Sequence, residues 1–147
     1  MNYAWVRSII ATALILGPAL VPISAVGQQK DLQQAVLGTW LITSVYDIRE
    51  NGQKNNPWGA GVKGTIVFGP DRSFTQVIIG EPRPDMKSGD PTKPDGPVVV
   101  LLGRYTAEGT DKISYKVDRG SNSMRNGAEQ SFTVSMNGDK AEFKGSP

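Results

Sequence analysis

Hydrophobic and polar positions alternate along most of the chain after residue 38. In the first such segment, one face is predicted to hold Trp40, Ile42, Ser44, Tyr46 and Ile48. A period of two residues is typical of a strand with one buried face. The sequence therefore predicts a strand over residues 40–48.

The same alternation predicts six further strands, which makes seven. They cover residues 62–68, 73–79, 98–102, 113–117, 131–136 and 140–144. Most connections are short, and Asn137-Gly138 is a strong hairpin signal. No strand–helix–strand crossover is visible, which predicts an antiparallel sheet. The apolar run 98–102 is predicted to be buried on both faces.

A short helix is predicted before the first strand. Asp31 is suited to cap its N-terminus, Gln34 stands where a capping box needs it, and Gly38 can end the helix. The helix would span about two turns. Trp40 follows at once and is predicted to seal the core beneath the helix.

An up-and-down order of strands leaves the first and last strands as the two edges of the sheet. Closure into a barrel removes exposed edges, and a barrel of about eight strands holds either packed side chains or one small ligand. The predicted fold is all-β, an antiparallel up-and-down β-barrel of about seven to eight strands with a short N-terminal helix. A two-sheet sandwich is less favoured, because Greek-key links need longer connections.

Residues 1–27 have the layout of a secretory signal peptide. Arg7 supplies the positive charge, residues 8–16 are mostly apolar, and small residues stand before Gln28. An uncleaved membrane anchor is less favoured, because Gly17, Pro18 and Pro22 interrupt the apolar stretch. The sequence predicts a secreted or periplasmic protein whose folded domain covers residues 28–147.

Residues 81–97 differ from the rest of the chain. This segment contains five Pro and, apart from Met86, no large apolar residue, so neither a helix nor a strand is expected. Long loops of this kind are often functional lids or rims. A solvated crossing with no such role is an equal alternative.

The chain contains no His and no Cys, with 16 Lys+Arg against 14 Asp+Glu. A histidine base, a thiolate or imidazole metal site and a disulfide are therefore excluded. Asp85, Asp90 and Asp95 lack the spacing of a calcium loop. We predict no catalytic residues, no metal and no cofactor. Basic residues are spread singly, so no nucleic-acid partner is expected.

Several short segments, taken in order, resemble the bacterial and fungal lipocalin-like domain family of calycin-type barrels. They are the segments 37–40, 56–59, 63–68, 70–74, 103–106 and 126–132. The resemblance covers nearly all of residues 34–144. It implies a barrel with an apolar pocket and does not point to a particular reaction.

Three functions are compatible with the sequence. The first is non-covalent binding of a small hydrophobic molecule in the barrel lumen, with apolar walls and a few polar groups. The second is an isomerase or cyclase that uses a buried Tyr or Glu. The third is a non-catalytic envelope interaction domain with a filled core. No protein partner is identified, and no membrane span is expected after signal cleavage. The predicted lumen lining is Ile42, Tyr46, Ile66, Phe68, Phe74, Gln76, Ile78, Tyr115 and Phe132.

The neighbouring residues in the sequence predict the position of two further side chains. Trp58 lies in a Gly- and Pro-rich connection and is predicted to be exposed. Arg104 falls on the face opposite to Tyr105 and is predicted to form polar contacts at the surface.

Overall fold

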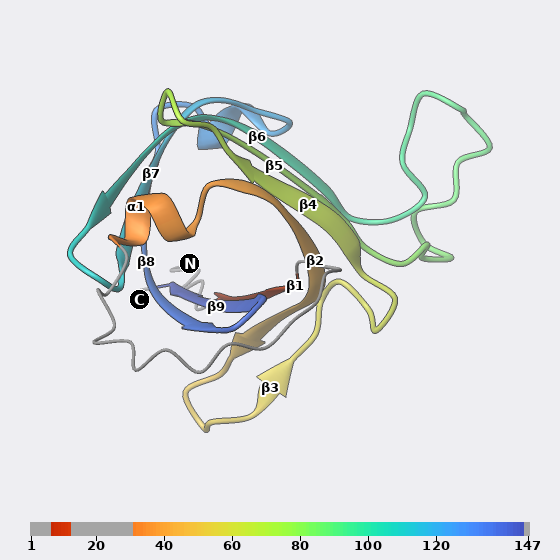
Figure 1. The fold of residues 1–147 in the computed structure, drawn as a ribbon. Coiled ribbons are helices and arrows are strands. Elements are labelled where there is room, and N and C mark those ends of the chain that lie inside the picture. Colours follow the sequence, from red (N-terminus) through yellow and green to blue (C-terminus); the bar gives the residue numbers. More distant parts are fainter. Residues whose placement is uncertain (1–6, 13–30, 146–147) are drawn as a thin grey trace, which may run out of the picture.

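A computed structural model of the chain describes residues 7–12 and 31–145. Eight of its strands form one antiparallel sheet that curves around a common interior, with the order β9-β8-β7-β6-β5-β4-β2-β3 (Figure 1). The predicted all-β, antiparallel architecture is confirmed. The strands are β2 (Gly38–Ile48), β3 (Lys54–Asn55), β4 (Lys63–Phe68), β5 (Ser73–Ile79), β6 (Val98–Glu108), β7 (Lys112–Gly120), β8 (Glu129–Asn137) and β9 (Lys140–Gly145).

A further strand, β1 (Arg7–Thr12), lies between the two ends of this sheet. It pairs antiparallel with β9 on one side and with β2 on the other, whereas β2 and β9 are not neighbours in the strand order. Residues 7–12 belong to the predicted signal peptide. The rest of that segment lies outside the described residues.

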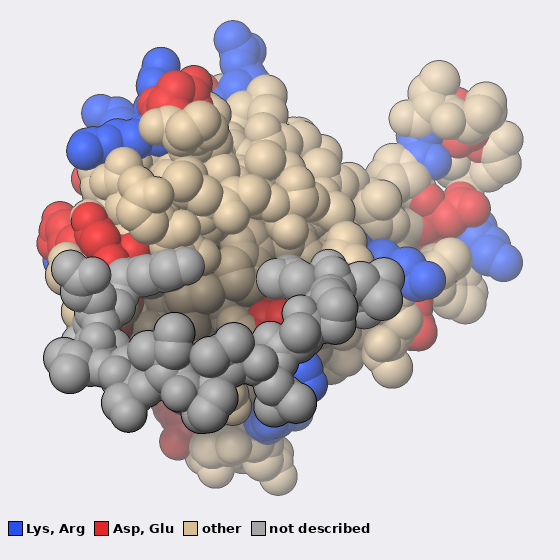
Figure 2. Space-filling model, in the orientation of Figure 1, with Lys and Arg blue, Asp and Glu red and all other residues tan. Residues whose placement is uncertain are grey.

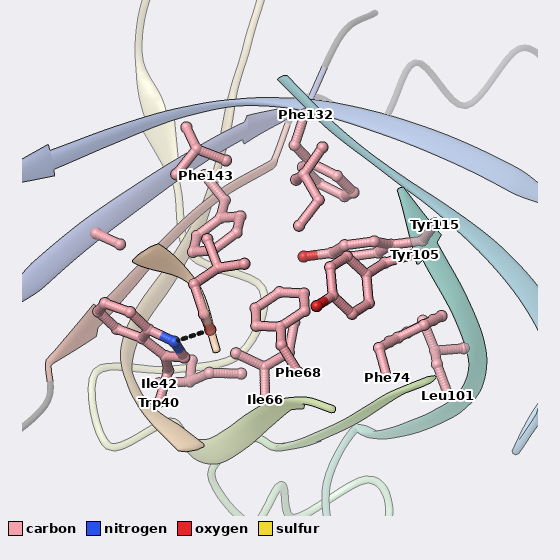
Figure 3. Packing of buried hydrophobic residues seen from close by; sticks show 14 of the residues in the cluster. Trp40, Ile42, Ile66, Phe68, Phe74, Leu101, Tyr105, Tyr115, Phe132 and Phe143 are labelled. Carbon is pink, nitrogen blue, oxygen red and sulfur yellow. Dashed lines mark hydrogen bonds between the residues drawn. The ribbon is translucent and has the colours of Figure 1, made fainter. Parts of the chain in front are cut away.

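The interior is a continuous cluster of hydrophobic side chains. Every strand from β2 to β9 except the two-residue β3 contributes to it, and the aromatic rings of Phe68, Tyr115 and Phe143 meet near its middle (Figure 3). The Phe68 ring centroid lies 6.0 Å from that of Tyr115 and 6.0 Å from that of Phe143. The inward positions therefore form one core rather than separate patches.

The helix α1 (Leu32–Ala35) lies across one end of the curved sheet (Figure 1). Asp31 caps it as predicted, since its carboxylate accepts a hydrogen bond from the backbone N–H of Gln33. The indole N–H of Trp40 donates to the carbonyl of Val36 over 2.7 Å. Trp40 is buried beneath the helix, as the sequence predicts. The helix is four residues long, shorter than predicted, because its chain turns into β2 directly after Val36.

The predicted phase of the first strand is wrong beyond Ile42. Trp40 and Ile42 are buried as expected, but the next core residue of β2 is Val45. The pairing with β1 shifts register between Ile42 and Ser44, which marks an irregularity of the β-bulge type. Because an extra residue reverses the alternation, Tyr46 is not part of the core cluster, although it is buried, with 9% of its surface exposed. Its ring sits 4.3 Å below the Lys54 ammonium group, and its hydroxyl donates to Glu142.

The apolar run 98–102 has one buried face, not the two predicted. Leu101 is buried and Leu102 is 45% exposed. The strand β6 continues through Glu108, pairing with β5 in its first half and with β7 in its second. Val98–Leu102 is thus the start of a long strand, because the sheet is a single layer with solvent on its outer side.

The Pro-rich segment 81–97 projects from the sheet as a separate lobe that carries both acidic and basic residues (Figures 1 and 2). Its base is tied by hydrogen bonds from Gly80 N–H to the Pro97 carbonyl and from Arg83 N–H to the Asp95 carbonyl. Most of its residues are exposed. The segment thus stands clear of the interior, and a lid role has no support from its position.

The turn between β4 and β5 carries a strained residue. Arg72 has a φ of 66°, the left-handed region that disfavours a side chain with a Cβ atom. We expect Arg72→Gly to raise the free energy of unfolding by about 1 kcal/mol, because glycine adopts this conformation without the steric cost. Urea denaturation of the two chains measures the difference. Arg72→Ala is the control, since it removes the same side chain and keeps the strain; an equal gain from both variants would contradict the argument.

Candidate functional site

The interior is lined almost wholly by hydrophobic side chains, with few polar groups among them. Gln76 is 5% exposed and lies on β5 between the inward residues Phe74 and Ile78. Among residues 31–145, no Asp, Glu, Lys or Arg belongs to the buried residues of the core, although one carboxylate oxygen of the half-buried Asp47 on β2 is shielded from solvent. The interior is therefore uncharged, and its polar chemistry rests on amide, indole and hydroxyl groups.

A small internal cavity adjoins Gln76. Its volume is about 10 Å³, which is close to the room that one water molecule needs. Its walls come from β2, β5, β6, β8 and the connection before β4. The lining residues are Val45, Trp58, Gln76, Ile78, Val99, Leu101, Gln130 and Phe132.

Trp58 forms part of the cavity wall, and the prediction that it is exposed is wrong. It is 7% exposed, and its indole Nε1 is buried without a hydrogen-bond partner. Its backbone is anchored by the carbonyl, which accepts from Glu81 N–H over 2.8 Å. The Glu81 carboxylate in turn accepts from Gly61 N–H over 2.6 Å. The loop is thus held from its outer side by Glu81.

Tyr115 supplies a second buried polar atom without a partner. Its ring stacks on Phe74 with centroids 4.6 Å apart, and Phe132 lies 4.8 Å away (Figure 3). The hydroxyl has no hydrogen bond. Burial raises the pKa of Tyr115 well above its ordinary value, so the group is a neutral hydroxyl at physiological pH. Tyr105 differs, because its hydroxyl donates to the Gly69 carbonyl over 3.0 Å.

The two tyrosines predict opposite effects of removing a hydroxyl. We expect Tyr115→Phe to leave the free energy of unfolding unchanged or raise it by about 1 kcal/mol, because no hydrogen bond is lost. Tyr105→Phe should lower it by about 1 kcal/mol, since the hydrogen bond from its hydroxyl to the Gly69 carbonyl is lost and only the Arg72 N–H still donates to that carbonyl. Chemical denaturation at pH 7 of the two variants tests the contrast. Equal losses would show that the Tyr115 hydroxyl does have a partner.

The raised pKa of Tyr115 also gives a pH dependence. Below about pH 10 the phenol is neutral in both the folded and the unfolded chain. Above that pH only the unfolded chain releases the proton, so stability falls as the pH rises toward the higher folded-state pKa. Tyr115→Phe should flatten this fall. Denaturation midpoints between pH 8 and 11 measure it.

The structure brings eight of the nine predicted lining residues into the interior. All eight are buried members of the core or, for Gln76, its buried polar residue. They are Ile42, Ile66, Phe68, Phe74, Gln76, Ile78, Tyr115 and Phe132. Tyr46 is the exception, for the reason given above.

Three of the eight cavity-lining residues, Gln76, Ile78 and Phe132, were in the predicted lining, and five were not: Val45, Trp58, Val99, Leu101 and Gln130. Trp58 sits in a turn between β3 and β4, where no periodic pattern indicates burial. Gln130 stands on β8 opposite Tyr115 and is half-buried. The alternation through Phe132 and Val134 extends to Gln130, so its inward position was available as a signal.

Charged groups lie on the outer face. The Arg104 guanidinium donates to the Asp71 carbonyl over 2.9 Å, which confirms its predicted place at the surface. Glu108 and Glu129, the carboxylates nearest to the strand ends, form exposed ion pairs with Lys112 and Lys116. In the described part of the chain, no three acidic side chains are grouped closely enough to hold a metal ion. The site can therefore bind and orient a neutral molecule, but it offers no charged acid or base.

Comparisons with known proteins add no assignment. No family model matches the chain, and no curated protein or solved structure matches it either. Among the described residues, the helices are too short and too polar to cross a membrane.

Proposed function

We propose that this chain is an exported, lipocalin-like binding protein, secreted or periplasmic, that holds a small hydrophobic molecule within a β-barrel. The antiparallel meander from β2 to β9, which lies outside the predicted leader and curves around one hydrophobic interior, supports the barrel. The ordered segments that resemble the lipocalin-like family support the same assignment. Export rests on the layout of residues 1–27.

The observation that carries the proposal is the pair of unpartnered donors in the interior. Buried hydroxyl and indole N–H groups almost always have hydrogen-bond partners, and each exception calls for a cause. Here the Tyr115 hydroxyl and the Trp58 indole are both exceptions, and Trp58 adjoins the cavity with Gln76. A ligand acceptor group in the cavity would satisfy the Trp58 indole, and a ligand that reached past Phe132 to Tyr115 would satisfy its hydroxyl with a second oxygen. The remainder of the ligand would contact the apolar walls.

Ligand entry requires Trp58 to move, because the cavity holds no more than about one water. If the Trp58 indole left the interior, the cavity would gain the volume of that side chain, which is the largest in its wall. The Trp58 loop is suited to such a movement, since it is fixed by a few hydrogen bonds: Trp58 N–H donates to the Asn56 side chain, Gly61 N–H donates to the Glu81 carboxylate, and Glu81 N–H donates to the Trp58 carbonyl. Burial of ligand surface contributes about 25 cal/mol per Å², which favours the open and occupied state.

The neutral interior indicates the ligand class. A carboxylate or phosphate would be buried without a cation, which costs several kcal/mol. An apolar molecule with one or two carbonyl, ether or hydroxyl oxygens fits better, since it accepts from Tyr115 and Trp58. Binding would be non-covalent, since none of the buried core residues among 31–145 is an Asp, Glu, Lys or Arg.

The test is native mass spectrometry of the protein purified from its own host, followed by delipidation and titration with the extracted molecule. We expect a bound apolar molecule, and its binding should quench or shift Trp58 fluorescence in a background with Trp5→Phe and Trp40→Phe, which leaves Trp58 as the one Trp of the sequence. Tyr115→Phe should weaken binding about tenfold without loss of stability, which corresponds to one hydrogen bond of about 1.4 kcal/mol. Leu102→Ala, a change on the outer face, is the matched control.

A second candidate function is a surface-acting envelope domain with a filled core. The close ring packing of Phe68, Phe74, Tyr115 and Phe132 favours it. That function predicts no co-purifying molecule and no response of Trp58 to any apolar probe. If both results are obtained, the binding function is wrong and the filled-core domain is the better assignment.

A further inference from the structure

We propose that the gap between β2 and β9 is a binding slot for one extended peptide strand, and that its occupant is the chain's own segment Arg7–Thr12. The proposal rests on backbone pairing and is independent of the ligand-binding function. It assigns a role in folding to residues that the sequence predicts to be a leader.

The slot is defined on both sides by backbone pairing, which is unbroken along β9 and carries one register shift along β2. Residues 8 to 12 pair in an unbroken antiparallel ladder with β9, from Ser8 opposite Lys144 to Thr12 opposite Lys140. The same segment pairs with β2, from Arg7 opposite Asp47 to Thr12 opposite Leu41. One six-residue strand therefore serves two edges that are distant in sequence. This is the geometry of strand addition, applied to both edges at once.

Parts of both edges are paired on one side by β1. On β2, the ladder with β4 ends at Ile42 and the ladder with β3 begins at Asp47. Within the described residues, β1 is the strand partner of residues 44–46, which lie between these ladders. On β9, only β8 pairs with the opposite side. Exposed edges of this kind recruit other strands, so an empty slot would not stay unpaired for long.

The slot also adjoins the core. Val45 and Phe143 are 1% and 0% exposed, and both stand opposite position 9 in the register. Phe143 stacks on Phe68 in the middle of the interior. Departure of β1 would therefore open the sheet beside two of the most buried side chains. The occupied slot keeps water out of the core.

Processing would change how the occupant is held. While residues 13–30 connect β1 to α1, the segment has an effective concentration on the order of millimolar at its slot. Any affinity tighter than about 100 μM then keeps the slot about 90% filled. Cleavage after Gly27 removes this advantage, and the segment would dissociate on dilution. The leader would thus act as a removable strand.

Cross-linking in the full chain tests the occupant and its register. The chain has no Cys, so two introduced cysteines are its only thiols. Directly opposed antiparallel residues are close enough for a disulfide. We expect Ser8→Cys with Lys144→Cys, and Thr12→Cys with Lys140→Cys, to cross-link under mild oxidation. The control, Ser8→Cys with Lys140→Cys, contains the same residue types out of register and should not. Equal cross-linking in all three, or in none, would overturn the proposal.

Hydrogen exchange then tests whether the strand is removable. A protease site placed within residues 24–27 allows the folded, purified chain to be cut and diluted. We expect amide exchange over residues 44–46 and 140–144 to rise at least tenfold after cutting. It should remain slow in a cut chain that carries the in-register cross-link at positions 8 and 144. Unchanged exchange in the cut chain without the cross-link would show that these edges do not depend on β1.

Discussion

Phe68→Ala is expected to lower the free energy of unfolding by about 3–5 kcal/mol, the range for loss of a buried aromatic ring. Phe68 is 1% exposed, and its ring lies edge-on to Tyr105, with centroids 5.0 Å apart, and stacks on Phe143. These neighbours come from β6 and β9, which lie on opposite sides of the interior. The truncation therefore leaves a cavity that no single strand can fill. Urea denaturation followed by circular dichroism measures the loss.

A matched control stands next to it in the sequence. Val67 is 37% exposed and lies on the outer face of β4. Val67→Ala should cost about 0.5 kcal/mol, because it removes little buried area and leaves the core intact. A loss for Phe68→Ala as small as that for Val67→Ala would mean that the aromatic cluster is loosely packed.

The sequence predicted the inward face of the middle strands well. Ile66, Phe68, Phe74 and Ile78 were placed by alternation alone, and all four are buried. Alternation works here because β4 and β5 pair without register shifts over their whole length. Each residue on one strand then faces the same side as its partner on the next.

Alternation failed where the backbone departs from a regular ladder. Tyr46 lies after a register shift in β2. A tyrosine occurs both inside and outside a core, so its presence in the sequence does not reveal the shift. The helix-side residue Trp40 was placed correctly, because it precedes the shift. The failure at Tyr46 is thus a consequence of bulge geometry, which depends on the partner strand.

The candidate site shows the same limit. Gln76 and Tyr115 lie on regular strands and were predicted, whereas Trp58 lies in a turn whose burial is decided by Glu81, a residue distant in sequence. The pairing of residues 7–12 was missed for another reason. A short apolar stretch near the N-terminus is typical of a leader and of a buried strand alike.

Gly103→Val is expected to lower the free energy of unfolding by about 3 kcal/mol, at the upper end of the usual cost of overpacking. Gly103 is a buried inward position of β6 that stands opposite Phe74 on β5 and Val117 on β7. A Cβ atom there would collide with the backbone carbonyl oxygen of Lys116 and lie 2.8 Å from the Phe74 ring. The carbonyl belongs to the ladder, so relief requires the two strands to separate beside the register shift between Leu102 and Gly103. Thr106→Val, on the outer face of β6, is the control and should change stability by less than about 0.5 kcal/mol. If the Gly103→Val variant were as stable as the unchanged protein, β6 and β7 would be able to move apart freely. The close approach of the two strands would then not be the reason for glycine at this position.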